Sequence, residues 1–312
     1  MLAQTLPPTE VVVSDDASTD GTVELARAVF DAHHRANPTV SIRLTVIENA
    51  TALGVSKNFE QAVAACVGEY SALSDQDDVW HEDRLDVAIR ALDGGPDLLV
   101  VFGGARMIDE RGEALGPSLF ASLELSRRMR EAIHQGRVFD ILLCRNLVAG
   151  ATVAFRRALV ESARPFPASW LHDEWLATVA AIAGRVDFVN GVLIDYRQHD
   201  GNEIGARSLS LLGKVKRVFE PGSARNERLL ARAADLADRV ARLPGAHGKH
   251  IVAAHEKLAH EQSRNSLPIR RLARVWPVVR ELRTGRYRTF GRGGADAFRG
   301  ILQSRATTRC AS

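Results

Sequence analysis

Short apolar runs alternate with helix-spaced apolar residues through the first two hundred positions. Residues 10–14 form a β-branched run, and after a polar turn apolar residues recur at Leu25, Ala26, Val29 and Phe30 with helical spacing. Further strands are predicted at residues 42–47, 70–73, 98–102, 186–189 and 192–194, and further helices over 59–64, 85–92 and 123–133 and after His172. The chain therefore begins as a series of strand–helix units.

Strands that alternate with helices indicate an α/β fold, with a parallel or mostly parallel sheet that carries helices on both faces. In such folds ligands bind beyond the carboxyl ends of the strands. From about residue 208 the pattern is purely helical, with breaks at pairs such as Pro244-Gly245. We expect an α/β domain over residues 1–207 and a helical extension over residues 208–312.

Charge divides the chain at nearly the same place. From residue 205 onward there are 23 Lys and Arg against 8 Asp and Glu, which leaves 18 against 30 for residues 1–204. An acidic region with clustered carboxylates suits metal ions, whereas a basic region suits phosphates, anionic lipids or nucleic acid. A solvated helical face explains the basic region equally well.

Cysteine content and hydropathy favour a cytoplasmic protein. Cys66, Cys144 and Cys310 are too few and too widely spaced for a disulfide framework or a Cys-rich zinc site. No stretch reaches the roughly 18 uncharged apolar residues of a membrane span, and the N-terminus lacks the pattern of a signal peptide. Peripheral contact with the inner face of the membrane is a further hypothesis.

A cluster of acidic residues follows the predicted strand at residues 70–73. Asp75, Asp77 and Asp78 lie within four positions, and because neighbouring anions repel, such crowding needs a cation or a proton to offset it. Mg²⁺ prefers oxygen ligands and is commonly held by one or two carboxylates together with substrate phosphates. The alternative is an acidic helix start, because Asp is favoured in caps and first turns.

Asp15 and Asp16 form a second acidic pair, at the end of the first predicted strand. The turn that follows could orient them towards the same crevice as the first cluster. A phosphate hydrolase of the haloacid-dehalogenase type also begins with a strand that ends in Asp. That class requires an Asp-x-Asp spacing, whereas here the two residues are adjacent.

Two later segments concentrate polar chemistry. Residues 170–175 place Asp173 and Glu174 beside His172 and between two tryptophans, where a partly desolvated carboxylate would gain the raised pKa of a general base. Residues 196–202 combine Arg197 and His199 in one loop, a set able to bind pyrophosphate and to donate a metal ligand. The alternatives are an N-capping Asp beneath packed indoles and an ordinary surface turn.

Taken in order, these segments resemble the family-2 glycosyltransferases with the GT-A fold, especially the rhamnosyltransferase-like group. The matching segments are residues 11–22, 49–58, 74–80, 146–152, 172–175 and 196–202. They bracket about two thirds of the chain.

The resemblance implies a role for each candidate residue. Those implied to bind the nucleotide sugar are Asp15, Asp16, Asn58, Asp77 and Arg197. Those implied to hold Mg²⁺ or Mn²⁺ are Asp75, Asp78 and His199, and those implied on the acceptor side are Gly150, Glu174 and Trp175. Asp173 is implied to be the general base that deprotonates an acceptor hydroxyl for inverting attack on the anomeric carbon.

One departure from the family concerns the start of the chain. Family members begin with an additional strand of the type Val-x-Val-x-Ile-Pro and a first helix, whereas only residues 1–10 precede the strand at Val11. Its absence would leave neighbouring strands with unpaired groups, at about 1–3 kcal/mol for each buried one. We hypothesise that the natural start lies upstream of Met1. A fully active native protein whose mass places Met1 or Leu2 at its N-terminus would contradict this.

The basic region contains one suggestive stretch, in which Leu272, Val275 and Trp276 lie among arginines. An amphipathic cationic segment of this kind could rest on an anionic membrane. Pro277 is expected to kink or end a helix there. Packing of the same face on the α/β domain is an equal alternative.

These features together predict a metal-dependent transferase that moves a sugar from a dTDP- or UDP-linked donor to a cell-surface glycan or a lipid-linked acceptor. The first rival is an inactive remnant or a nucleotide-sugar-binding module, favoured by the missing strand. The second is a nucleic-acid-binding protein that uses the basic region. We do not expect nucleic acid as a partner, because few aromatic residues interleave with these arginines.

Overall fold

A computed structural model describes residues 1–198 and 223–303 of the chain. It divides into two compact units, Met1–Val138 with Leu147–Ala206 and Phe139–Asn146 with Arg207–Ser312, which we call the α/β unit and the helical unit. A short segment from within the expected α/β domain thus belongs to the helical unit. The Phe139 ring packs on the His250 ring with 5.0 Å between centroids, and the Cys144 thiol donates to the carbonyl of Gly291 at 3.3 Å.

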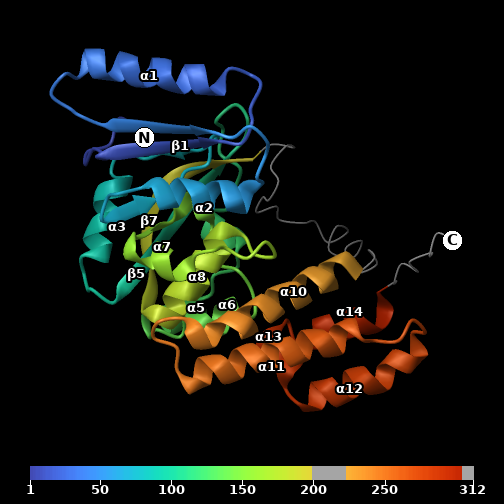
Figure 1. The fold of residues 1–312 in the computed structure, drawn as a ribbon. Coiled ribbons are helices and arrows are strands. Elements are labelled where there is room, and N and C mark those ends of the chain that lie inside the picture. The colour runs from blue at the N-terminus through green and yellow to red at the C-terminus, as the bar shows by residue number, and fades with distance from the viewer. Residues whose placement is uncertain (199–222, 304–312) are drawn as a thin grey trace. The chain divides into compact units, whose positions relative to one another are not determined.

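The strands of the α/β unit form two separate sheets (Figure 1). They are β1 Glu10–Asp15, β2 Arg43–Glu48, β3 Tyr70–Ala72, β4 Val79–Trp80, β5 Leu98–Ile108, β6 Ala154–Arg156 and β7 Arg185–Arg197. β1 pairs with β2 in parallel, and the other five follow the order β3-β6-β5-β7-β4. In that sheet β5 and β7 are parallel and the other three pairs are antiparallel. The α/β class is confirmed, with strand directions more mixed than expected.

Several strands and helices have other bounds than expected, because long-range pairing and helix capping set where they begin and end. The two strands predicted at residues 186–189 and 192–194 are one strand, β7, whose pairing with β5 shifts in register around Gly104. β5 itself continues to Ile108, because its second half stays paired with β7. The helix expected over residues 123–133 begins four residues later, at Arg127, where the Ser126 hydroxyl caps its start by accepting from the amide of Met129.

Helix α8 forms the centre of the α/β unit. The helices of this unit are α1 Thr22–Ala36, α2 Val55–Ala65, α3 Arg84–Leu92, α4 Leu119–Ser122, α5 Arg127–His134, α7 Ala158–Ala163 and α8 His172–Ala183, with the 3₁₀ turn η1 Gly150–Thr152. α1 and α2 lie on opposite faces of the β1–β2 sheet (Figure 1). α2 also packs on α8, where the Phe59 and His172 rings stack 3.8 Å apart. Eleven of the twelve residues of α8 are buried, so its first turn is held rigidly.

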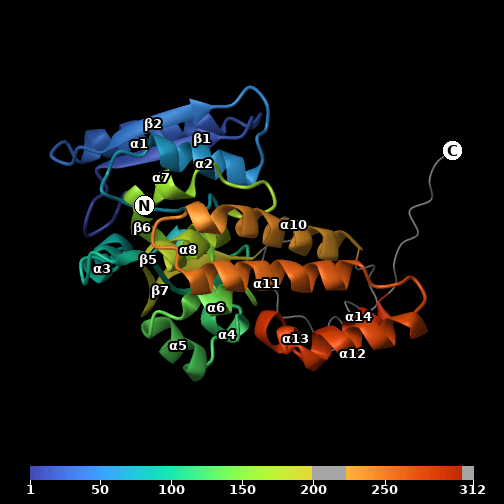
Figure 2. The same cartoon turned by 60° about the horizontal axis from the view of Figure 1, so that its bottom comes forward.

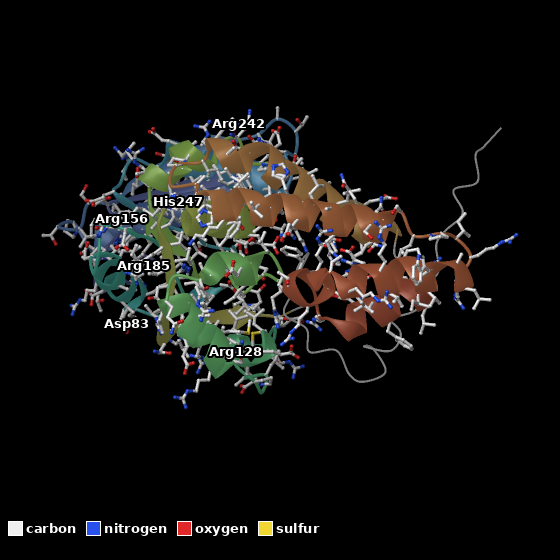
Figure 3. All side chains as sticks on the ribbon, turned by 90° about the horizontal axis from the view of Figure 1, so that it is seen from below. Asp83, Arg128, Arg156, Arg185, Arg242 and His247 are labelled. Carbon is white, nitrogen blue, oxygen red and sulfur yellow. The ribbon has the colours of Figure 1, made fainter. Side chains whose placement is uncertain are left out.

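The helical unit is built around two long helices that run side by side (Figure 2). Its elements are α6 Val138–Leu142, α10 Ser223–Arg239, η2 Val240–Arg242, α11 Gly248–Asn265, η3 Leu272–Arg274, α12 Val275–Arg283, α13 Arg286–Phe290 and α14 Gly294–Leu302. The exposed side chains of Arg242 and His247 flank the tight turn between α10 and α11 (Figure 3). The expectation that Pro277 breaks a helix is wrong. It lies in the first turn of α12, where an amide has no helical partner to lose.

Neither unit offers a helix with the combined length and apolar character needed to cross a bilayer, as far as residues 1–198 and 223–303 are concerned.

Candidate functional site

Two half-buried carboxylates, those of Asp75 and Asp78, lie on the turn between β3 and β4. Burial is the main cause that raises the pKa of Asp75 to about 6 and that of Asp78 to about 7, and each is raised further by the neighbouring aspartates. One oxygen of Asp78 accepts a hydrogen bond from the amide of Arg197 at 2.9 Å. Its other oxygen, Oδ2, is buried and has no hydrogen-bond partner among the described residues. This turn therefore concentrates negative charge that its own surroundings compensate incompletely.

A buried arginine lies beneath the aspartates. Arg84 begins α3 and is 1% exposed, and its guanidinium donates to the carbonyl of Leu73 at 2.8 Å and lies 3.7 Å from the centre of the Trp80 ring. Burial lowers its pKa to about 9, while the charges of Asp78 and Asp75 act in the opposite direction. Sequence reasoning missed Arg84, because an arginine in an amphipathic helix normally faces solvent. Its position close behind an acidic turn was the only available signal.

Asp173 lies at the first turn of α8 with both carboxylate oxygens engaged. Oδ2 accepts from the amide of Gly150 at 2.9 Å, and Oδ1 accepts from the amide of Glu174 at 2.7 Å. The charge of Asp173 is among the causes that raise the pKa of Asp75, so the first turn of α8 lies close enough to the acidic turn for their charges to interact. The structure thus brings together carboxylates separated by almost one hundred residues in the chain.

Gly150 allows this approach because it has no side chain. A Cβ atom at that position would lie 3.1 Å from Nε2 of His172 and 3.3 Å from Cβ of Asp173. Both distances are tighter than normal carbon contacts. The residue therefore orients Asp173 through its amide, and a larger residue would have to displace His172 or Asp173.

His172 is a second functional candidate whose role the sequence did not indicate. Its side chain is 6% exposed, stacks on Phe59, and has no hydrogen-bond partner for either ring nitrogen among the described residues. Burial lowers its pKa to about 3, so the ring is neutral at physiological pH. A neutral, unpartnered imidazole therefore lies directly beside the carboxylate of Asp173 in the chain.

The acidic pair at the end of β1, Asp15 and Asp16, accepts hydrogen bonds from loops other than the turn between β3 and β4. Asp16 accepts from the amide of Leu53 at 2.6 Å, from the amide of Gly54 at 2.9 Å and from the side chain of Asn49 at 3.2 Å. The bond from Leu53 is the main cause that holds the pKa of Asp16 below its usual value. Asp15 is buried and accepts from the amide of Ser18. Both carboxylates thus shape the loops around the carboxyl ends of β1 and β2.

Asn58 on α2 joins this helix to β1 through hydrogen bonds. Its amide group donates to the carbonyl of Ser14 at 2.8 Å, and its oxygen accepts from the Ser14 hydroxyl at 2.6 Å and from Asn49 at 3.1 Å. Gln61 joins the same network by donating to Ser14 and Asn49. These polar groups therefore hold one another in place.

A matching sequence model decides the family. The model described as glycosyl transferase family 2 matches residues 1–158, just over half of the chain. The chain belongs to this family. Among curated proteins, uncharacterized protein Rv1520 of Mycobacterium tuberculosis is 30% identical over 194 residues, which cover 62% of this chain and 51% of that protein. The chain thus spans about half the length of the first such relatives.

Two further comparisons concern a named enzyme and the fold. The dTDP-rhamnosyl transferase RfbG of Shigella flexneri is 24% identical over 229 residues, which cover 70% of this chain and 71% of that protein. The crystal structure of S. aureus TarS 1-349 covers 96% of this chain and 83% of its own, with 16% identity and a TM-score of 0.51. At that identity the likeness shows the fold alone.

Several candidate residues of this family-2 chain are hydrogen-bonded to other parts of the protein or buried in it. Arg197 donates to the backbone carbonyls of Asp77, Asp109 and Glu110 at 3.0–3.1 Å, so its guanidinium stabilises the end of β7. Trp175 is fully buried, and its indole N–H donates to the carbonyl of Ala163, so it has no surface to offer an acceptor. Glu174 is 7% exposed. The roles assigned to Arg197 and Glu174 remain predictions, whereas the burial of Trp175 leaves it no contact with an acceptor.

The chemistry of the acidic turn fits a divalent cation. Asp75 and Asp78 offer hard oxygen ligands, and the unpartnered Oδ2 of Asp78 is the kind of atom that a cation would satisfy. Among the described residues no group of three or more His, Cys, Asp and Glu side chains is arranged to hold a metal. His199, the third expected ligand, lies outside the described residues.

A hollow of about 590 Å³ lies elsewhere in the α/β unit. Its lining includes Gly104, Phe120, Arg130, Asn190 and Val192, near the register shift between β5 and β7. None of the candidate aspartates lines it, so the hollow is separate from the acidic turn.

Proposed function

We propose that this chain transfers a sugar from a nucleoside-diphosphate donor to a hydroxyl group of a glycan or of a lipid-linked acceptor. The observation that carries the proposal is the pair of half-buried carboxylates, Asp75 and Asp78, whose pKa values are raised, that of Asp75 in part by the charge of Asp173. Membership of glycosyl transferase family 2 supports the same reaction class.

Asp75 and Asp78 would hold Mg²⁺ or Mn²⁺, with His199 as a further candidate ligand. When bound, the cation would supply electrostatic stabilisation of the departing diphosphate. Because burial raises the pKa of both carboxyl groups, they must lose protons as they bind a cation. Asp77 would contact the donor at the same turn.

Asp173 would act as the general base in an inverting displacement. The acceptor hydroxyl gives its proton to this carboxylate, its oxygen forms the new bond to the anomeric carbon, and the bond from that carbon to the diphosphate oxygen breaks. The two backbone amides on Asp173 support this role by fixing its orientation before the acceptor arrives.

For the nucleoside of the donor we propose thymidine or uridine. The relative RfbG bears the name dTDP-rhamnosyl transferase and overlaps most of both chains, which supports a dTDP-sugar. Asp15, Asp16 and Asn58 are the proposed contacts for the nucleotide, through the loops that they organise at the carboxyl ends of β1 and β2.

The test is a screen of nucleotide sugars for transfer and for donor hydrolysis, repeated with Asp173→Asn. We expect that substitution to lower the transfer rate by about 10²–10⁴-fold, because the acceptor hydroxyl keeps its proton. Nucleotide binding with Mn²⁺, measured by calorimetry, should be nearly unchanged. The matched control is Glu174→Gln, which removes the adjacent charge and should raise the KM for the acceptor with a smaller effect on kcat. Transfer at the normal rate by Asp173→Asn would eliminate this base.

A second candidate is a module that binds nucleotide sugars without turnover, or an inactive remnant. The observation that favours it is the division of the strands into two sheets, with β1 and β2 separate from the other five. Calorimetry with UDP and dTDP in the presence of Mn²⁺ separates the two forms, because a remnant should release no heat with either nucleotide. A binding module should bind one of them and show no transfer in the screen.

A further inference from the structure

An exposed apolar cluster marks the start of α12 in the helical unit. Leu272 is 89% exposed, Trp276 68%, Ile269 67% and Val275 43%. Residues 272, 275 and 276 have the spacing of neighbours on one side of a helix. Large apolar side chains grouped in this way at a surface mark an interaction site more often than single exposed ones do. We call these four residues the apolar tip.

The opposite side of the same segment is built into the unit. Arg274 is 2% exposed, and its guanidinium donates to the carbonyls of Pro268 at 2.6 Å, Ile269 at 2.9 Å and Gln303 at 2.5 Å. Val278 is 1% exposed in a core with Leu267 and the ring of Tyr287. Anchoring on this side orients the apolar tip outward in a fixed conformation.

The surroundings of the apolar tip are strongly basic. Residues 269–302 contain nine arginines and two acidic residues, and both acids, Glu281 and Asp296, are buried. The exposed arginines are Arg270, Arg271, Arg280, Arg283, Arg288 and Arg292. The guanidinium of Arg283 lies 5.9 Å from the centre of the Trp276 ring. The surface around the tip is therefore cationic and exposes no carboxylate from this stretch.

We propose that the apolar tip and its flanking arginines bind the surface of an anionic phospholipid bilayer. Leu272 and Trp276 enter the boundary between headgroups and acyl chains, where an indole ring is favoured. Arg270 and Arg271 lie next to the tip in the chain and contact lipid phosphates, each adding about fivefold to the partition coefficient. A double-stranded nucleic acid would use the arginines but would leave Leu272 and Trp276 in water. Bases of a single strand would stack on Trp276 and still leave Leu272 and Ile269 in water, so the combination favours a lipid surface.

Vesicle sedimentation with the full chain, without nucleotide, tests the proposal. Vesicles of equimolar phosphatidylcholine and phosphatidylglycerol should bind the protein, vesicles of phosphatidylcholine alone should bind it far more weakly, and added salt should weaken the binding. Leu272→Gln and Trp276→Gln should each reduce the partition coefficient by about tenfold, because each replaces an apolar side chain that enters the bilayer with a polar one. Arg270→Gln with Arg271→Gln should reduce binding to the anionic vesicles only.

The matched control uses exposed apolar residues of the other unit. Leu25 and Val29 on α1 are 66% and 48% exposed, and Leu25→Gln with Val29→Gln should leave vesicle binding unchanged. Equal binding to neutral and anionic vesicles, or an equal loss with the α1 variant, would overturn the proposal. So would binding to DNA or RNA without binding to vesicles, or a dimer that Leu272→Gln dissociates in the absence of vesicle binding. Because no donor or acceptor is present, these outcomes are independent of the transfer activity.

Discussion

Gly150 shows how one missing side chain positions a proposed catalytic group. Its amide donates to Asp173, and a Cβ atom would approach both His172 and Asp173 within 3.1–3.3 Å. We expect Gly150→Ala to displace Asp173 by a few tenths of an ångström and to lower kcat by about 10–100-fold, because the base loses its alignment. Steady-state kinetics with the best donor measures this.

Gly248→Ala is the control for that substitution, because a Cβ atom there meets nothing within 4 Å and the residue begins a helix. Its kcat should match that of the unchanged protein. A Gly150→Ala enzyme with full kcat would show that the loop does not position the base.

His172 makes the stability of the α/β unit depend on pH. Its folded pKa of about 3 lies below the usual value of about 6.5, so the unfolded chain binds a proton first as the pH falls. The free energy of unfolding is therefore unaffected by His172 above about pH 6.5 and falls between about pH 6.5 and pH 3, by on the order of 5 kcal/mol in total. His172→Phe keeps a ring to stack on Phe59 and should flatten this part of the profile.

Urea unfolding at a series of pH values measures the effect, and the exposed residue His255 provides the control. His255→Phe should leave the slope of stability against pH unchanged. An unaltered slope with His172→Phe would mean that this imidazole takes up a proton in the folded protein.

At the level of elements, the loop between β2 and α2 depends on a carboxylate from β1. Asp16 provides the acceptor for the amides of Leu53 and Gly54. We expect Asp16→Ala to destabilise the α/β unit by about 1–2 kcal/mol, because two loop amides exchange a charged acceptor for water. It should also raise the KM for the donor if this loop contacts the nucleotide.

Asp20→Ala removes a carboxylate whose hydrogen bonds, among the described residues, go to nearby Thr22, and it should leave the unfolding midpoint nearly unchanged. Denaturation combined with donor kinetics separates the two effects of Asp16→Ala. A lower stability with an unchanged KM would assign Asp16 to loop structure alone.

For the whole molecule, the two units have different means of stabilisation. The α/β unit has a mostly apolar centre in α8, whereas the helical unit buries a charged cluster in which Glu261 lies 2.8 Å from both Lys257 and Arg264. Glu261→Gln leaves two buried cations with a neutral partner and should lower the free energy of unfolding of the helical unit by about 3–5 kcal/mol. Scanning calorimetry should show a shift of one unfolding transition, while the other stays in place.

Glu256→Gln, at an exposed position of the same helix, is the control and should shift neither transition. If Glu261→Gln moves both transitions together, the two units unfold as one cooperative body.

The parts of the fold that could be predicted from the sequence depend on local pattern. Periodicity indicated the strands at residues 10–14, 42–47 and 70–73, each within a residue or two, and the acidic turns that follow two of them. The register of β5 on β7 could not be predicted, because it depends on residues almost ninety positions apart. For the same reason one long strand, β7, was expected as two.

The sequence alone determined the family, because the matching pattern of aspartates, glycines and turns is a property of the order of residues along the chain and needs no coordinates. Only the tertiary structure decided which polar groups lose water. It placed Arg84 beneath Asp75 and Asp78, packed His172 against Phe59, and closed Gly150 onto Asp173. Burial and long-range proximity set these protonation states and orientations, and neither is a property of neighbouring residues in the chain.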